Sequence, residues 1–218
     1  MSSERFLPTV LLRPAFMYGP GDFTTFNSML VMAEISRRQG KPTMVYYGDE
    51  IRLDMIHVRD VARSILHAAI WHARPITTAQ RIEIFNVTPM EHRLVSELTT
   101  MAMHTVGVKT KRMPYLHRLL FKNVPADVIA KKVNEQYLPI WDEMVRTSGA
   151  RPSPVGPRLD PVQLKNGHHC SFLLNGSKLL HGTGFVPMYP ICSEFTWMEV
   201  IDEWRSMDIW PKELSVTC

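Results

Sequence analysis

Residues 11–22, LLRPAFMYGPGD, are the stretch that decides the fold. An apolar, β-type run over residues 9–12 stops at Arg13-Pro14, and an aromatic-rich turn then leads into Gly19-Pro20-Gly21-Asp22. Proline lacks the N–H that a strand ladder needs, and Gly/Pro pairs stop regular structure, so we expect a buried strand that ends in a loop. Open α/β sheets bind ligands at the carboxyl ends of their strands. The stretch therefore predicts an α/β fold with a binding turn after this strand.

Composition and charge limit the class of protein. The chain has 218 residues, of which 45% are hydrophobic and 21% charged, which is ordinary for a globular protein. The 25 Lys and Arg residues are spread along the sequence without the dense basic stripe of a nucleic-acid-binding surface, so we expect no nucleic-acid partner. The three cysteines are too scattered for a disulfide framework or a zinc motif, which favours a reducing, cytoplasmic location. No leader pattern and no run of about 18 apolar residues occurs, so no membrane span is expected.

Hydrophobic spacing beyond the turn predicts alternating helices and strands. The expected strands cover residues 43–47, 52–58, 81–87 and 109–113. The first expected helix begins after residue 23 and stops at Gly40, and the second follows an N-cap at Asp60. A third covers 94–106 and ends at Gly107. A fourth covers 115–141 with interruptions at Pro125 and Pro139, and the last follows a cap at Ser193. The proline-rich segment 151–161 is expected to be a loop, and residues 159–164 can start a short helix.

Three segments of the sequence resemble one family of α/β enzymes. Residues 13–20, RPAFMYGP, have the form RPxxxYGP, and residues 54–69, DMIHVRDVARSILHAA, have the form D-h-h-x-V-x-D-V-A. Residues 175–187 are close to a closing pattern x-S-K-h-x-x-x-L-G-F-x-P. The segments come in the family's order and at plausible distances. The chain therefore resembles the extended short-chain dehydrogenases/reductases, the NAD-dependent epimerase/dehydratase family.

The resemblance implies an α/β fold that is the C-terminal part of a Rossmann-like extended short-chain dehydrogenase, with a small mixed α/β substrate-binding lobe. The whole chain, 1–218, would be a single incomplete domain. Residues 1–22 would form a late Rossmann strand and its turn, and residues 81–87 a strand that returns to the main sheet. Residues 23–80 and 88–192 would form the substrate-side lobe, and residues 193–218 the closing helix and tail.

Two parts of that family's machinery are missing from the sequence. No G-x-x-G-x-x-G or G-x-G-x-x-G motif occurs, and none of the six tyrosines has a lysine four residues later. We therefore expect no catalytic residue in this chain, and we expect the chain to begin after the cofactor-binding half. In the intact family, bound NAD or NADP exchanges a hydride with a secondary alcohol or carbonyl carbon, and the Tyr of Tyr-x-x-x-Lys acts as the acid/base. We expect this chain alone to bind neither NAD nor NADP, and its expected partners are a small-molecule substrate and the missing N-terminal half.

The resemblance also suggests which residues lie near the cofactor. Pro14, Ala15 and Met17 occupy the turn that would touch the nicotinamide edge through backbone groups. Phe16 and Tyr18 of the same turn would face the substrate. The alternative is that this turn is only a structural end to a strand.

Phe16 and Arg52 bear on the substrate class. Many sugar-nucleotide members carry Asn at the position of Phe16, and phenylalanine cannot hydrogen-bond the diphosphate oxygen, which favours an apolar substrate. In that family an arginine near the position of Arg52 binds the substrate diphosphate. Here Leu53 stands between Arg52 and Asp54, one residue more than in the family's usual Arg-Asp order. This shift would turn the Arg52 side chain to the other face of a strand. A solvated surface arginine is the alternative.

The remaining candidate residues have simple structural interpretations. Asp60 is explained by capping of the next helix. His168, His169 and Cys170 lack ligand spacing, so no metal site is expected. Two functions remain open. One is the substrate-binding portion of an oxidoreductase for either nucleotide sugars or apolar, hydroxysteroid-like alcohols and ketones. The other is a truncated, non-catalytic binding or interaction module.

Overall fold

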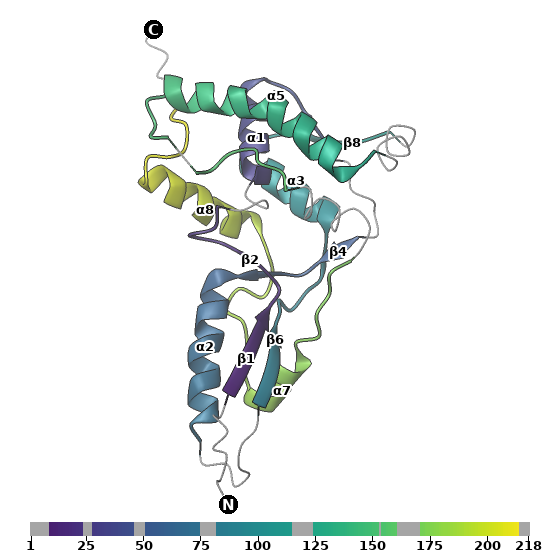
Figure 1. Ribbon diagram of the computed structural model, residues 1–218, viewed down its shortest axis with the longest axis vertical. Coiled ribbons are helices and arrows are strands. Elements are labelled where there is room, and N and C mark those ends of the chain that lie inside the picture. Colours follow the sequence, from purple (N-terminus) through teal and green to yellow (C-terminus); the bar gives the residue numbers. More distant parts are fainter. Residues whose placement is uncertain are drawn as a thin grey trace, which may run out of the picture. The chain divides into compact units, whose positions relative to one another are not determined.

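The computed structural model describes residues 9–23, 28–45, 51–74, 82–114, 124–152, 154–160 and 171–213 (Figure 1). The predicted helix segment 115–123 and most of the predicted short helix 159–164 lie outside these ranges, as do Phe26, Arg81 and the end of the strand predicted for 43–47. The chain divides into two compact units. Unit 1 comprises residues 1–17, 54–92 and 172–192, and unit 2 comprises 18–53, 93–171 and 193–218.

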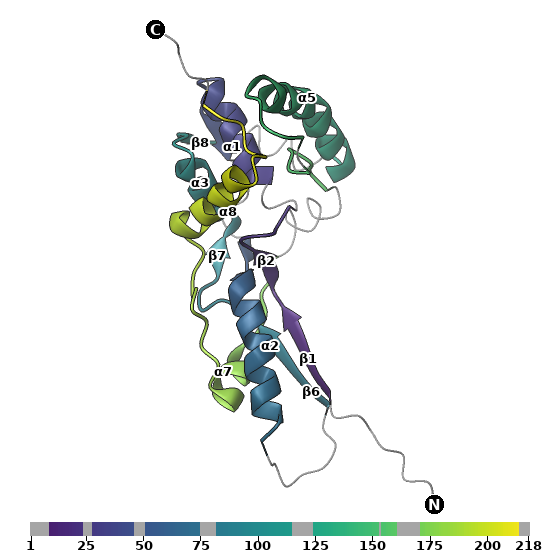
Figure 2. The ribbon, with the colours of Figure 1, turned by 90° about the vertical axis from the view of Figure 1, so that its left-hand side faces the viewer.

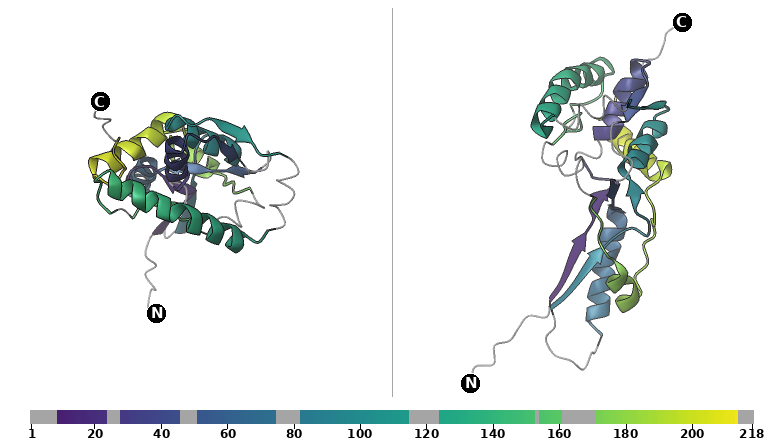
Figure 3. Two further views of the ribbon diagram at one scale, coloured as in Figure 1. Left: turned by 90° about the horizontal axis from the view of Figure 1, so that it is seen from above. Right: turned by 90° about the vertical axis from the view of Figure 1, so that its right-hand side faces the viewer.

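Unit 1 is built on two parallel strands, β1 (Thr9–Pro14) and β6 (Ile82–Val87), with Leu11 opposite Ile84 and Pro14 opposite Val87. Helices α2 (Val58–His72) and α7 (Ser177–Thr183) lie on the same side of the pair (Figure 3, right). The core of the unit is apolar and comprises Ala15, Ile56, Phe85, Val87, Leu179 and Phe185, with Val10, Leu12, Val61 and Trp71 packed against it. Alternate residues of each strand face this core because side chains of a strand alternate between its faces.

The other face of the strand pair is apolar and exposed. The exposed fractions are 44% for Leu11, 68% for Ile82 and 36% for Ile84. These residues occupy register positions between those that face the core. Among the described residues, β1 and β6 pair only with each other, so each strand leaves one edge without a ladder partner there.

The strand predicted for 52–58 is divided in the structure. Arg52–Leu53 form β4, Met55–His57 form β5, and Val58 already begins α2. Strand β5 pairs with β2 (Phe16–Tyr18). The prediction that Asp60 caps α2 is wrong, because the N-cap is His57, whose side chain accepts from the Arg59 N–H.

Within the described residues, unit 2 contains four longer helices: α1 (Ser28–Arg38), α3 (Val95–Thr105), α5 (Ala126–Thr147) and α8 (Glu194–Ser206). Strands β3 (Thr43–Val45) and β8 (Thr110–Arg112) pair in parallel, and β4 pairs antiparallel with β7 (Arg93–Leu94). Three fully buried tryptophans, Trp141, Trp197 and Trp204, anchor the packing of α5 and α8 within the unit.

A buried carboxylate supports one end of α1. Glu34 is 2% exposed and forms ion pairs with Arg37 and Arg38 one turn later. Its hydrogen bond raises the pKa of Arg37 further above the usual value, so this guanidinium stays charged. The two arginines also complement the carboxyl end of the helix.

The expected interruption of the helix at Pro139 is wrong. Helix α5 runs through Pro139 without a break, and Pro125 precedes its first residue as the N-cap. Pro139 has no N–H to donate to the Glu135 carbonyl four residues earlier. Both residues are exposed, so water can hydrogen-bond that carbonyl instead. A proline on the solvent side of a helix is tolerated at a cost in stability.

Most of the other local predictions are confirmed. Gly40 and Gly107 end their helices with φ of 65° and 78°, and Ser193 caps α8 by accepting from Thr196 N–H. The α/β class with parallel strands is also confirmed. However, α2 and residues 172–192 group with β1 and β6, whereas the sequence-based division placed these segments in the lobe. In the described ranges, no helix is long and apolar enough to cross a membrane.

Candidate functional site

The turn after β1 is held by backbone hydrogen bonds at the carboxyl end of the strand pair. The Ala15 N–H donates to the Val87 carbonyl at 2.9 Å, and the Phe16 N–H donates to the Asp54 carbonyl at 3.2 Å. The turn therefore joins the ends of β1 and β6 to the segment before β5. Carboxyl ends of parallel strands are the usual ligand-binding edge of α/β sheets.

The three residues predicted to lie near a cofactor are together in unit 1. Pro14 is the last residue of β1 and is half-buried, and Ala15 is 4% exposed within the core. Met17 has an exposed side chain, at 49%. Their placement at the strand end agrees with the sequence analysis, and their contact with a cofactor stays a prediction.

The predicted substrate residues are divided between the units. Phe16 lies in unit 1, where its ring centroid is 4.8 Å from that of Phe172. Tyr18 lies in unit 2, is fully buried, and donates its hydroxyl to Thr196 Oγ1 at 3.3 Å. Arg52 is exposed on β4 of unit 2. Tyr18 therefore packs within unit 2, and its contact with a substrate stays a prediction.

Asp54 is the polar centre of this end of unit 1, and the sequence analysis did not single it out. Its side chain is fully buried, and Oδ2 accepts from the Leu174 N–H at 2.8 Å. Oδ1 pairs with His92 Nδ1, and the Asp54 N–H donates to the Phe172 carbonyl at 3.0 Å. One aspartate thus connects the turn, the loop after β6 and the segment before α7. Its place at the start of DMIHVRDVA, between apolar neighbours, was the available sequence signal.

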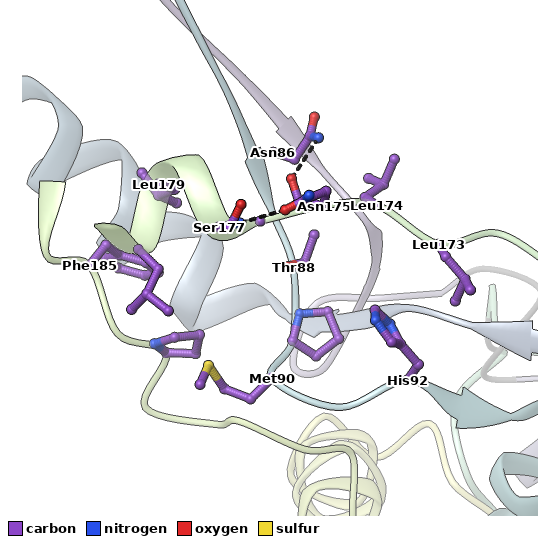
Figure 4. A pocket seen from close by; sticks show the side chains of 14 residues that line it. Asn86, Thr88, Met90, His92, Leu173, Leu174, Asn175, Ser177, Leu179 and Phe185 are labelled. Atoms are coloured by element: carbon purple, nitrogen blue, oxygen red, sulfur yellow. Dashed lines mark hydrogen bonds between the residues drawn. The ribbon is translucent and has the colours of Figure 1, made fainter. Parts of the chain in front are cut away.

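A cavity of about 560 Å³ lies beside this centre, between the loop at residues 88–92 and the segment at residues 173–177 (Figure 4). Leu179, Phe185 and Pro187 make its apolar wall. The size is that of a small-molecule site. All of its lining residues belong to unit 1.

The polar groups of the cavity come from both of its borders. Asn86 Nδ2 donates to the Asn175 carbonyl at 3.0 Å, and Asn175 Oδ1 accepts from the Ser177 N–H at 2.9 Å (Figure 4). His92 lines the cavity, and its Nδ1 is held by the Asp54 carboxylate. An imidazole oriented by a carboxylate can hydrogen-bond a ligand or exchange a proton with it through its second nitrogen. Such a site suits a small, partly apolar molecule with a polar head.

A metal centre has no support in the described part of the chain, where no three His, Cys, Asp or Glu residues are grouped as metal ligands. His168, His169 and Cys170 lie outside the described residues.

The sequence and the fold agree on one relationship. Residues 2–86, which include β1, its turn, Asp54 and α2, match the sequence model described as the NAD dependent epimerase/dehydratase family. This part of the chain is similar to that family. The resemblance inferred from the RPAFMYGP and DMIHVRDVA segments is thereby confirmed. No curated protein matches the sequence significantly.

Solved structures share the fold at low identity. A UDP-galactose 4-epimerase is 13% identical with a TM-score of 0.51, and the match covers 93% of this chain and 47% of that one. MoeE5, solved in complex with UDP-glucose and NAD, is 17% identical with a TM-score of 0.50, covering 92% and 48%. Pal from Bacillus thuringiensis is 14% identical with a TM-score of 0.50, covering 92% and 47%. The chain thus spans about half the length of these epimerase-like structures.

The family uses a dinucleotide cofactor, but the residues present do not make a complete site for one. The Ala15 and Phe16 N–H groups at the turn already donate within the fold. The sequence contains no Gly-rich turn to receive a pyrophosphate. The described residues would form only one wall beside a dinucleotide. We therefore derive no chemical step that involves the cofactor.

Proposed function

We propose that this chain is the substrate-side portion of an NAD(P)-dependent oxidoreductase or epimerase that acts on a secondary alcohol or carbonyl carbon. The observation that carries the proposal is the RPAFMYGP turn at the carboxyl ends of the parallel strands β1 and β6, within the segment that matches the family. In this proposal Pro14, Ala15 and Met17 form the wall beside the nicotinamide. Phe16 faces the substrate.

The uncovered face of the strand pair supports a partner in this function. Leu11, Ile82 and Ile84 are exposed on it, as expected for strands that form part of a larger sheet. We propose that a polypeptide carrying the Gly-rich turn and Tyr-x-x-x-Lys covers this face and completes the enzyme. This chain would bind and orient the substrate, and the partner would supply the cofactor and the acid/base tyrosine.

The substrate is either an apolar alcohol or ketone or a nucleotide sugar. The contact between Phe16 and Phe172 places a second aromatic ring beside this position, which favours the apolar class. The nucleotide-sugar class is favoured by MoeE5, whose structure holds UDP-glucose. Arg52 is exposed and could pair with a diphosphate, as an arginine fork does.

Two titrations test these assignments on the 218-residue chain. We expect a sterol-like secondary alcohol to bind more tightly than UDP-glucose, and Phe16→Asn to reverse that order by providing an amide for the diphosphate. Met44→Asn, at an exposed position of unit 2, is the control and should leave both affinities unchanged. Tighter binding of UDP-glucose by the unaltered chain would assign the nucleotide-sugar class, and binding of neither ligand would contradict the substrate-side role.

A non-catalytic binding or interaction module is the second candidate. The absence of both Tyr-x-x-x-Lys and a Gly-rich turn from the sequence favours it for this polypeptide alone. Under either proposal we expect no measurable binding of NAD or NADP and no turnover of alcohols by the isolated chain. Calorimetric titration that shows micromolar affinity for NAD or NADP would overturn this expectation.

A further inference from the structure

The cavity of about 560 Å³ in unit 1 has a polar centre and apolar sides. One of its borders follows the carboxyl end of β6 and the other leads into α7, and both elements are labelled in Figure 2. Leu179 of α7 packs with Phe85 and Val87 of β6 in the core of the unit, which holds the two borders together. None of the residues 14–18 lines the cavity, so it is separate from the turn after β1.

Amide and hydroxyl groups make the polar centre. Asn86 Nδ2 donates to the Asn175 carbonyl, and Asn175 Oδ1 accepts from the Ser177 N–H, so these bonds orient both amides (Figure 4). Among the described residues, Asn86 Oδ1, Asn175 Nδ2 and the Ser177 hydroxyl make no hydrogen bond. The centre therefore offers a ligand one acceptor, one donor and one group that can act as either.

The lining does not favour an anionic ligand. Its described residues include no lysine, arginine, aspartate or glutamate, and a protonated His92 would be balanced by the Asp54 carboxylate that pairs with its Nδ1. Lys178 is next to the cavity in the sequence, but its ammonium group pairs with Glu83 Oε2 at 2.8 Å and lies over the Phe85 ring. A phosphate or carboxylate in the cavity would lose hydration without gaining a counter-charge.

The apolar sides can hold a hydrocarbon or aromatic group. Leu179 and Phe185 lie at the left of the cavity in Figure 4, and Pro187 continues this wall. A sugar ring carries hydroxyl groups that donate and accept hydrogen bonds, so it can bind the polar centre while an attached apolar group packs on the wall. The volume is within the range of small-molecule sites.

We propose that this cavity binds a neutral glycoside. The sugar hydroxyls hydrogen-bond the amides of Asn86 and Asn175 and the hydroxyl of Ser177, and the apolar aglycone packs on Leu179 and Phe185. The site is additional to the substrate contact proposed at the turn after β1. It depends only on the residues that line the cavity, so it can fail or succeed independently of the proposed enzymatic role.

Three probes test the chemical class in calorimetric titrations of the 218-residue chain. The compound para-nitrophenyl β-D-glucoside carries a sugar and an aromatic group, para-nitroanisole carries the aromatic group alone, and para-nitrophenyl β-D-glucuronide adds a carboxylate to the sugar. We expect the glucoside to bind at least roughly threefold more tightly than either of the others, because only the glucoside hydrogen-bonds the amides without burying a charge. Equal or tighter binding of the glucuronide or of para-nitroanisole would overturn the proposal. Absence of glucoside binding at about 10 mM would overturn it as well.

Two variants test the place of the sugar. Asn175→Asp keeps an oxygen for the Ser177 N–H but replaces the Nδ2 donor with a charged acceptor, and Ser177→Ala removes only the hydroxyl. Each should weaken glucoside binding by roughly threefold to tenfold, which corresponds to one neutral hydrogen bond. Circular dichroism verifies folding, and if one variant does not fold, the other still decides.

Gln136→Glu is the matched control, because it also changes an amide to a carboxylate but lies exposed on α5 of unit 2. It should leave the dissociation constant of the glucoside unchanged. Full affinity in both Asn175→Asp and Ser177→Ala, or an equal loss of affinity in Gln136→Glu, would overturn the assignment of the sugar to this cavity.

Discussion

At the scale of single residues, Asp54 links the turn after β1, the loop after β6 and the segment before α7. Its buried carboxylate accepts from the Leu174 N–H and pairs with His92. Asp54→Ala would leave that N–H without its acceptor, and we expect a loss of about 2–3 kcal/mol in the free energy of unfolding. Urea unfolding followed by circular dichroism measures it. Asp142→Ala, at an exposed position of α5, should change stability by less than about 0.5 kcal/mol; equal losses for both variants would contradict this role.

Gly176 shows a second constraint at this scale, set by a close approach rather than by backbone conformation. A Cβ at this position would lie 2.1 Å from Thr88 Oγ1 and 3.3 Å from Thr88 Cβ. We expect Gly176→Ala to lower stability by about 1–3 kcal/mol through overpacking. Part of the loss should be recovered in the Thr88→Ala background, which removes the hydroxyl.

Gly176 is the N-cap of α7, and its matched control is Gly182 within that helix, where a Cβ would meet nothing within 4 Å. Gly182→Ala should leave stability unchanged or raise it slightly, because alanine favours the helix. If Gly176→Ala is as well tolerated as Gly182→Ala in urea unfolding, the wall between residues 88 and 176 is not as tight as described.

At the scale of elements, Asp60 fastens the loop after α7 to the first turn of α2. Its carboxylate accepts from the N–H groups of Met188 and Tyr189, both at 2.7 Å, and pairs with Arg63. Asp60→Ala should therefore speed hydrogen exchange of these two amides by roughly 5- to 100-fold, the equivalent of about 1–3 kcal/mol. Exchange at Trp197 in α8 should stay unchanged, and unchanged exchange at Met188 and Tyr189 would refute the role of Asp60.

Local signals predicted the ends of elements better than their interiors. Glycines with positive φ and the Ser193 cap act within one turn of the chain, so the sequence alone revealed Gly40, Gly107 and the start of α8. The continuous helix through Pro139 and the break at Asp54 were missed. Both depend on which side of an element faces solvent or a distant partner, and that is set by packing.

At the scale of the whole molecule, the apolar open face of β1 and β6 should govern behaviour in solution. Exposed apolar strands with unpaired edges favour association between chains. We expect the double variant Leu11→Thr/Ile82→Thr to remain clear by light scattering at higher concentration than the unaltered chain, with the same thermal midpoint, because threonine retains β propensity. Met44→Thr, exposed on β3, is the control and should not change the threshold. Equal thresholds for the unaltered chain and the double variant would refute this role of the open face.

The candidate site was only partly predictable. The RPAFMYGP turn, its place at a strand end and the family were inferred from short motifs, because those residues are neighbours in sequence and each has a distinctive type. The role of Asp60 was misjudged, because its side chain is buried against partners far along the chain, the N–H groups of Met188 and Tyr189. The hydrogen bond of Tyr18 to Thr196 could not be foreseen from the sequence for the same reason.

The sequence by itself predicted most of the longer helices and strands in their order, the α/β class and the likeness of residues 2–86 to the family, because these follow from local propensity and contiguous motifs. Only the tertiary structure decided that Asp54, Leu174 and His92 meet beside a cavity, and that β1 and β6 keep an apolar open face. A carboxylate can accept from many N–H groups, and an apolar residue can pack against many surfaces. The three-dimensional arrangement of the chain selects which of these partners is present and which face stays open.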